Sequence, residues 1–251
     1  MRAELAQRYR DSAIYPGQEL DALAGAWNYY TWILGHFLPY LGRRVIEVGA
    51  GIGTFSQFLQ SAGADLSELV LVEPADNLFP ILARRFAREP RVRAVHGLLE
   101  DAGDGCRGAA DSIVLVNVLE HIDDDQRFLE TAFRMLRPQG RLLLLVPACP
   151  ALYGTLDGAF GHARRYTKPA LRDRLRAGGF EVIRLRYFNF PGVVTWFLAG
   201  RVLRRRTLGP VAVKLYDRLV VPWASRLEGV EPPVGQSLVG IATKPAAEGL
   251  S

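Results

Sequence analysis

A glycine-rich segment between an apolar run and an amphipathic run constrains this chain most. The apolar residues 44–48 lead directly into Gly49, Gly51 and Gly53, and residues 54–62 follow with apolar side chains at helical spacing. Glycine allows a tight turn and lets a ligand come close to the backbone. Free N–H groups at the start of a helix favour a carboxylate or another polar group. The segment therefore predicts a strand, a ligand-binding turn and a helix.

The same alternation of strand and helix continues along the chain. The expected strands are residues 44–48, 69–73, 91–95, 112–117, 141–146, 180–187 and 237–243. The expected helices are residues 18–38, 54–62, 76–88, 124–136 and one that Thr167 and Pro169 open. Strands that alternate with helices predict an α/β fold, with a doubly wound, mostly parallel, seven-stranded Rossmann-like sheet covered by helices on both faces.

We expect a single domain over residues 1–251, with two additions to a common core. An N-terminal helical cap takes up residues 1–42, and the ligand-binding core takes up residues 43–189. A helical insert spans residues 190–235, before the last strand and tail at residues 236–251.

Composition narrows the class of protein. Apolar residues make up 49% of the chain and charged residues 23%, which is typical of globular proteins and excludes a disordered chain, a collagen and a coiled coil. The chain lacks the run of about 18 apolar residues that a transmembrane helix needs, and its start lacks a signal-peptide core. Cys106 and Cys149 have no metal-ligand or redox spacing. We therefore expect two reduced thiols in a cytoplasmic protein.

The spacing of the glycines separates two kinds of nucleotide-binding protein. A dinucleotide fingerprint that starts at Gly49 needs glycine or alanine at position 54, where this chain has Thr54. The pattern is instead Glu-x-Gly-x-Gly-x-Gly over residues 47–53, which resembles motif I of class I S-adenosylmethionine-dependent methyltransferases. The resemblance implies that S-adenosylmethionine is the cofactor. The expected cofactor-binding residues in this segment are Glu47, Gly49, Ala50, Gly51 and Gly53.

Two further segments bear on the cofactor. Glu73 ends the second expected strand about 20 residues after the glycines, where an acidic side chain can accept hydrogen bonds from both ribose hydroxyls. Many methyltransferases have an aspartate for the adenine amino group after the third strand, but this chain has Leu98 and Leu99 there. We therefore expect an apolar wall against the adenine, with Glu100 or Asp101 nearby.

Later stretches extend the resemblance. Residues 117–124 and 137–141 resemble the corresponding regions of small-molecule methyltransferases related to quinone-biosynthesis enzymes, although Gln139 departs from their usual Pro-Gly-Gly turn. Segments at residues 28–32 and 153–166 resemble a bacterial branch often associated with glycosyltransferases. Asn117 is expected to contact the cofactor. Tyr30 either caps the cofactor from the N-terminal helix or packs in the core.

Two histidines are candidate general bases, because imidazole exchanges protons near neutral pH. His121 follows the fourth strand, whose end faces the active site in this fold; alternatively it helps Glu120 and Asp123 fix the start of a helix. His162 follows the fifth strand. Glu120 and His121 have no third ligand at a recognisable spacing, so no metal site is predicted.

The loop around His162 is expected to cross the acceptor pocket. Arginine can hold an anionic acceptor through two parallel hydrogen bonds. The alternative is a surface loop in which Asp157 pairs with the neighbouring arginines. The expected acceptor-binding residues are Tyr153, Arg165 and Tyr166.

The insert combines apolar and basic residues. The whole chain carries 31 basic and 26 acidic residues, a net charge of +5. Residues 184–228 alone carry nine basic and two acidic residues, a net charge of +7, around the apolar residues 193–200. Such a segment can lie on an anionic lipid surface, form a lid over an apolar acceptor, or pack on the sheet with its arginines in water. Aliphatic neighbours and the lack of a known binding module argue against a nucleic-acid partner.

These features predict S-adenosylmethionine-dependent methyl transfer to a small or lipid-like acceptor, with an oxygen favoured as the methyl acceptor. One alternative is a nicotinamide-dependent oxidoreductase on a related fold. The other is a membrane-peripheral module that binds S-adenosylmethionine without catalysis. The sequence leaves the oligomeric state open.

Overall fold

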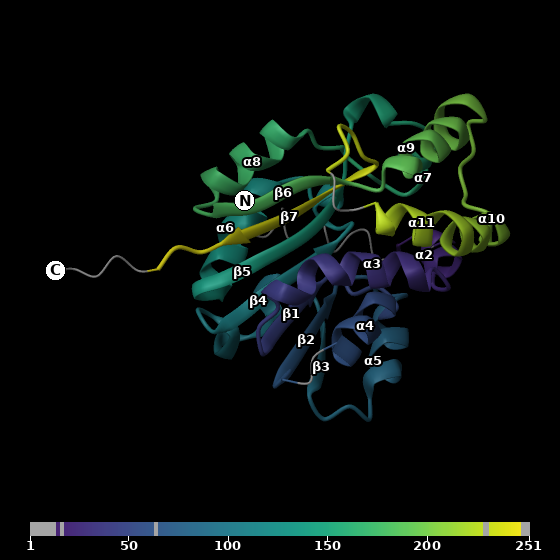
Figure 1. The fold of residues 1–251 in the computed structure, drawn as a ribbon. Coiled ribbons are helices and arrows are strands. Elements are labelled where there is room, and N and C mark those ends of the chain that lie inside the picture. Colours follow the sequence, from purple (N-terminus) through teal and green to yellow (C-terminus); the bar gives the residue numbers. More distant parts are fainter. Residues whose placement is uncertain (1–13, 16–17, 63–64, 228–230, 247–251) are drawn as a thin grey trace.

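The computed structural model describes residues 14–15, 18–62, 65–227 and 231–246, which form one seven-stranded sheet with helices on both faces (Figure 1). The strands are β1 (Arg44–Val48), β2 (Glu68–Glu73), β3 (Val92–His96), β4 (Ala110–Val116), β5 (Leu136–Pro147), β6 (Glu181–Phe188) and β7 (Ser237–Thr243). Their order in the sheet is β3-β2-β1-β4-β5-β7-β6. In this sheet β7 runs antiparallel to both β5 and β6, and the other paired strands are parallel. The predicted Rossmann-like, mostly parallel sheet is confirmed.

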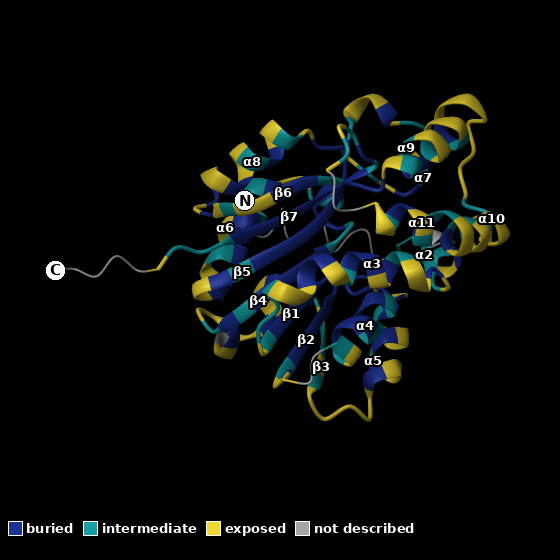
Figure 2. Ribbon diagram, viewed as in Figure 1, coloured by how far each residue is buried: buried dark blue, intermediate teal, exposed yellow. Residues whose placement is uncertain are grey.

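Side chains of successive strand residues point to opposite faces of the sheet, and the central residues of the strands are buried on both faces (Figure 2). Val45 packs on one face and Ile46 on the other, as the period of two requires. One face is covered by α3 (Trp27–Phe37), α4 (Thr54–Ala62), α5 (Phe79–Phe86) and α11 (Val221–Arg226). The other is covered by α6 (Asp125–Met135) and α8 (Lys168–Ala177).

The N-terminal segment forms two helices, so the single helix expected over residues 18–38 is wrong. The first helix, α2 (Gln18–Leu23), ends before Gly25, and α3 begins at Trp27. Glycine disfavours a helix interior by about 1 kcal/mol relative to alanine. The break also lets the buried carboxylate of Asp217, from the insert, accept hydrogen bonds from the backbone N–H groups of Asn28 (3.3 Å) and Tyr29 (2.9 Å). A distant residue thus caps α3.

Two further boundaries differ from expectation. The helix expected from residue 76 begins only at Phe79, because Asp76 pairs with His96 (3.0 Å) instead of capping a helix. The strand expected from residue 141 begins at Leu136 and passes through Gln139, which has a positive φ of 62°.

The insert between β6 and β7 is helical, as predicted. The helix α9 (Phe190–Trp196) continues as a π-helix over Phe197–Val202. After a loop, α10 (Pro210–Leu215) continues through a second π-helix, Tyr216–Val220, into α11. Within the described residues, no helix has the length and apolar character to cross a membrane.

Candidate active site

A cavity of about 1310 Å³ lies at the carboxyl ends of β1, β2 and β4. The insert contributes apolar side chains to its wall, among them Ala199, Leu208 and Val213. The following predicted site residues line it: Tyr30, Glu47, Gly49, Ala50, Gly51, Glu73, Leu98, Leu99, Asn117, His121, His162 and Arg165. The structure therefore brings most of the predicted cofactor and catalytic residues together.

The glycines after β1 have two different roles. Gly49 has a φ of +67°, and a Cβ there would lie 2.6 Å from Cγ2 of Val118 on the opposite wall. Gly53 does not line the cavity. A Cβ at Gly53 would lie 2.6 Å from Cε2 of Phe86, so this glycine lets α4 and α5 pack closely. Gly53 thus has a packing role, and its direct contact with the cofactor stays a prediction.

Glu73 fastens the glycine turn to the end of β2. Its Oε2 accepts a hydrogen bond from the Gly51 N–H (2.7 Å), and its Oε1 accepts one from the Ala75 N–H (2.9 Å). Burial raises the pKa of Glu73, and these two backbone hydrogen bonds oppose that rise. A carboxylate has about four acceptor positions, so Glu73 can still accept hydrogen bonds from a ligand.

Glu47 is a buried carboxyl group whose Oε2 has no hydrogen-bond partner among the residues that the structure describes. Burial, with a smaller contribution from the nearby Glu73 carboxylate, raises the pKa of Glu47 to about 8. Burying an ionised carboxylate costs free energy unless a cation or hydrogen-bond donors compensate it. The site is thus prepared for a cationic ligand group.

We predict that Glu47→Gln is more stable than the parent protein at pH 8, by a margin that shrinks towards pH 5. In the unfolded chain, the Glu47 carboxyl group loses its proton near the ordinary glutamate pKa of about 4.3. The folded protein holds it until about pH 8, so the stability of the parent falls as pH rises through this window. Glutamine does not titrate.

Thermal unfolding at both pH values checks this prediction, since about 1 kcal/mol moves Tm by about 2–4 °C in a domain of this size. The control is Glu100→Gln, at an exposed position on the rim of the same cavity. A Tm difference for Glu47→Gln that is the same at pH 5 and pH 8 would contradict the prediction.

The part of the cavity where we expect the adenine is an apolar wall with a fixed acidic neighbour. Leu98 and Leu99 line it, and Asp101 accepts a hydrogen bond from the Leu98 N–H (2.8 Å) through its Oδ2. Asn117, at the end of β4, lies opposite in the left-handed region, with a φ of 54°. Tyr30 lines the cavity and also packs against Phe58, so its position is compatible with both predicted roles.

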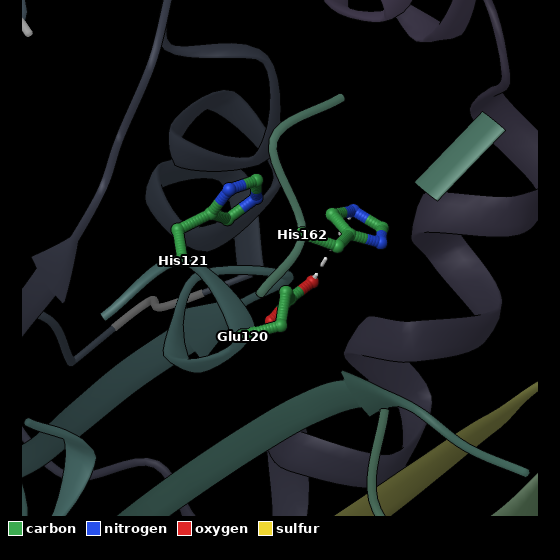
Figure 3. Close-up of side chains that lie close together, drawn as sticks. All are labelled: Glu120, His121 and His162. Atoms are coloured by element: carbon green, nitrogen blue, oxygen red, sulfur yellow. Dashed lines mark ion pairs between the residues drawn. The ribbon is translucent and has the colours of Figure 1, made fainter. Parts of the chain in front are cut away.

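Glu120, His121 and His162 converge beyond the end of β4 (Figure 3). The Nδ1 of His162 lies 2.9 Å from Oδ1 of Asp157, and its Nε2 lies 3.9 Å from Oε1 of Glu120. The Nδ1 of His121 lies 3.2 Å from the Gly161 carbonyl oxygen. The two imidazole rings meet edge to face, with centroids 5.0 Å apart. In both rings, Nδ1 is therefore held by a hydrogen-bond acceptor, and the Nε2 of His162 faces Glu120.

The three groups sit in a dry environment. Both carboxylate oxygens of Glu120 are buried and lack a hydrogen-bond partner within the described part of the chain. Burial raises the pKa of Glu120 to about 7, although the neighbouring His162 lowers it. Burial, followed by repulsion from His162, lowers the pKa of His121 to about 4. His121 is therefore neutral at physiological pH.

The same three residues could hold a metal ion, because ligand atoms from each lie within 4.8 Å of one another. No third ligand for Glu120 and His121 was recognisable from sequence spacing, since His162 is 41 positions beyond His121 in the chain. Only the fold brings it beside them.

Arg165 forms part of the wall between the histidines and the insert. Its Nε donates to Oδ1 of Asp157 (2.7 Å), and its Nη1 donates to the Ala148 carbonyl (2.8 Å). The guanidinium lies 4.9 Å from the centroid of the Trp196 ring, whose Nε1 also donates to Asp157. Its buried Nη2 has no acceptor among the described residues.

Two predicted acceptor-binding residues lie outside the cavity wall. The buried Tyr166 donates its hydroxyl to Oδ2 of Asp125 (2.8 Å), which fixes the loop to α6. The exposed Tyr153 donates its hydroxyl to the His162 carbonyl (2.8 Å). Both tyrosines therefore brace the loop that carries His162, and their direct contact with the acceptor stays a prediction.

Sequence reasoning missed two residues of the insert. Trp196 fills the wall beside Arg165, and nothing in its local spacing distinguishes it from a core residue. Asp217 also lines the cavity while it caps α3. The available signal was that Asp217 is an isolated acid in a strongly basic stretch.

Comparison with known proteins supports the sequence resemblance. A family model described as a methyltransferase domain matches residues 27–185, more than half of the chain. A probable S-adenosylmethionine-dependent methyltransferase of Mycolicibacterium smegmatis is 31% identical over 143 residues, covering 56% of this chain and 53% of that protein. The ubiquinone biosynthesis O-methyltransferase of Erwinia tasmaniensis is 27% identical over 114 residues, covering 44% and 45%. The chain spans about half the length of these curated relatives.

Solved structures share the fold. An S-adenosylmethionine-dependent methyltransferase of Thermotoga maritima superposes with a TM-score of 0.62 at 19% identity, covering 96% of this chain and 99% of that chain. Phosphoethanolamine N-methyltransferase 2 of Haemonchus contortus, in complex with S-adenosylmethionine, has a TM-score of 0.63 at 18% identity, covering 94% and 60%. The chain therefore belongs to the methyltransferase-domain family, with ubiquinone biosynthesis O-methyltransferases among its relatives, and S-adenosylmethionine is its cofactor.

Proposed function

We propose that this chain methylates a hydroxyl oxygen of a lipid-like acceptor. The observation that carries the proposal is the cavity itself, which runs from the glycine turn to His121 and His162 under an apolar wall from the insert. An apolar acceptor gains free energy by entering such a cavity, and a hydroxyl group must lose its proton to be methylated. The ubiquinone biosynthesis O-methyltransferases among the relatives support oxygen as the methyl acceptor.

The residues of the first half of the cavity fit the cofactor. The uncompensated carboxyl of Glu47 would bind the methionine ammonium, and the backbone N–H groups of the glycine turn would bind the methionine carboxylate. Glu73 would accept hydrogen bonds from the ribose hydroxyls. Leu98 and Leu99 would pack against the adenine. When bound, S-adenosylmethionine supplies a methyl group on a positively charged sulfur.

The second half of the cavity handles the acceptor. Asp157 binds Nδ1 of His162 and so leaves Nε2 as the proton acceptor toward the cavity. We assign His162 as the general base, and His121 as a neutral neighbour that helps to position the acceptor hydroxyl. Arg165, with one buried N–H group unpaired, would bind an anionic group of the acceptor.

The outer surface of the insert supports a second part of the proposal, which is contact with a lipid surface. Its exposed apolar side chains include Val194, Leu198, Val202, Leu203, Val211, Leu215, Leu219 and Trp223. Exposed arginines at positions 201 and 204–206 lie between them in sequence. Apolar side chains with arginines suit the boundary of an anionic membrane, and the inner side of the same insert lines the acceptor cavity. A lipid acceptor could then enter from the membrane side.

The experiment that tests the proposed function incubates the purified protein with S-adenosylmethionine and a membrane lipid extract, and measures S-adenosylhomocysteine. We expect product that requires both the protein and the extract. Binding of S-adenosylmethionine without product, over extracts from several sources, would favour the non-catalytic module. An absorbance change with reduced nicotinamide would favour the oxidoreductase. A tRNA U34 carboxymethyltransferase of Syntrophotalea carbinolica is also similar, at 30% identity over 164 residues, so a tRNA fraction is the control acceptor.

A further inference from the structure

A second hollow, of about 620 Å³, lies between α3, β6 and α11, outside the cavity that holds the proposed active site. Three arginines line it, Arg184 and Arg186 from β6 and Arg226 from α11. None of its described lining residues is acidic. It is therefore a strongly cationic hollow on the face of the sheet that the insert reaches.

The strand and the insert together produce this concentration of charge. Arg184 and Arg186 are two residues apart on β6, so their side chains project to the same face. Arg226 comes from the last turn of α11. Glu231 interacts electrostatically with Arg186, and its carboxylate also binds Lys168 and the Tyr187 N–H. The described lining of the hollow thus holds three arginines and no acidic side chain.

One residue that lines the hollow has a neutral hydrogen-bond donor. Trp32 is a buried residue of α3 that lines the hollow, and its indole Nε1 has no hydrogen-bond acceptor anywhere in the described part of the chain. A buried donor without an acceptor is costly, and a ligand oxygen would satisfy it. Charge and donor therefore both point to an anion with several oxygen atoms.

Apolar side chains lie beside the hollow on the same helical stretch. Asp217, Val221 and Ala224 face the protein and are buried. Leu219, Trp223 and Leu227, each four positions apart, are exposed by 70%, 58% and 56%. Because Arg226 and Pro222 of this stretch line the hollow, its apolar outer face directly adjoins the cationic hollow.

We propose that this hollow binds the phosphate headgroup of an anionic phospholipid, whose acyl chains contact Leu219, Trp223 and Leu227. Guanidinium groups bind phosphate oxygens through paired hydrogen bonds, and the Trp32 indole donates to another oxygen. A phospholipid joins a phosphate to apolar chains, which matches a cationic hollow beside an apolar face. The inference rests on the proposed membrane contact of the insert, and it adds a specific lipid site to that contact.

The test measures binding of the full chain to soluble dihexanoyl-phosphatidylglycerol by titration, and to phosphatidylcholine vesicles with and without phosphatidylglycerol by sedimentation. The double variant Arg184→Gln/Arg226→Gln should weaken both kinds of phosphatidylglycerol binding by about 30-fold. The matched control, Arg204→Gln/Arg206→Gln, removes the same charge from exposed positions outside the hollow. It should leave binding of the soluble lipid within about twofold of the parent value.

Two further variants keep the test valid if the double glutamine variant does not fold. Arg184→Lys/Arg226→Lys retains the charge and should keep most of the binding. Trp32→Phe retains an aromatic ring but removes the indole N–H, and should weaken binding of the soluble lipid by about fivefold.

Three outcomes would overturn the proposal. If Arg184→Gln/Arg226→Gln and Arg204→Gln/Arg206→Gln lose equal affinity for the soluble lipid, the attraction is diffuse charge attraction. The membrane contact of the insert would then stand without a specific lipid site. Inorganic phosphate that binds as tightly as the soluble lipid would show a free-anion site. If Arg184→Gln/Arg226→Gln weakens the binding of a short RNA but leaves vesicle binding unchanged, the hollow is a nucleic-acid site. The assay contains no S-adenosylmethionine, so failure of the proposed methyl transfer is measured separately.

Discussion

Replacing Glu73 with alanine should weaken the binding of S-adenosylmethionine by roughly 10²- to 10⁴-fold. A hydrogen bond to a charged group contributes about 1.5–3 kcal/mol, which is roughly one to two decades of affinity, and Glu73 is expected to accept two from the ribose. The substitution also removes the acceptor of the Gly51 N–H, which is 2.7 Å from the carboxylate. The glycine turn then loses the side chain that holds it to β2.

Isothermal titration calorimetry with S-adenosylmethionine and S-adenosylhomocysteine measures this loss directly. The matched control is Glu68→Ala, at the opposite end of the same strand, where the glutamate pairs with Arg44 at the surface. The control should bind the cofactor as the parent does. Glu73→Gln keeps one acceptor oxygen, and its affinity for the cofactor should lie between that of Glu73→Ala and that of the parent. Unchanged affinity in a folded Glu73→Ala protein would remove the ribose role from this residue.

The core of the fold was predictable because its signals are local. Each central strand is an apolar run that needs burial on both faces, and each helix shows its own apolar spacing. The glycine turn was predictable for the same reason, since Gly49 and its neighbours lie within one short segment. The boundary errors have non-local causes. The start of α3, for example, is capped by Asp217, which is 189 positions away from Asn28.

The catalytic part of the site was harder to predict because it is assembled from distant segments. His121 and His162 belong to separate motifs in the sequence, and only the fold brings His162 beside Glu120 and His121. Tyr166 belongs to the same motif as Arg165, but adjacent residues of an extended segment point to opposite sides. Arg165 thus faces the cavity while Tyr166 is buried against Asp125. Motif membership identified the right loop without identifying which side chains face the acceptor.

The insert links the proposed chemistry to the proposed surface contact. Its inner side chains, such as Val213 and Tyr216, line the acceptor cavity, and its outer side chains, such as Leu219, are in solvent. Asp217 holds the same segment to the start of α3. A change that releases this cap should therefore alter both the cavity wall and the outer apolar face.

Replacing His162 with glutamine should lower the rate of methyl transfer by roughly 10²- to 10⁴-fold, because general base catalysis contributes about that much. Affinity for S-adenosylmethionine should stay within about threefold of the parent value, a change of less than about 0.7 kcal/mol, because His162 lies beyond the residues expected to hold the cofactor. Product formation from the lipid extract and calorimetry with the cofactor measure the two quantities on the same preparation.

The matched control is His96→Gln, which changes a histidine at the end of β3 that pairs with Asp76 and does not line the cavity. It should retain the parent rate. Asp157→Asn keeps His162 but removes the carboxylate beside it, and asparagine cannot stabilise the imidazolium as a carboxylate does. We expect it to lower the rate less than His162→Gln while retaining cofactor binding. A His162→Gln protein with the parent rate would instead move the proton acceptor to His121 or Glu120, the two remaining groups of the cluster.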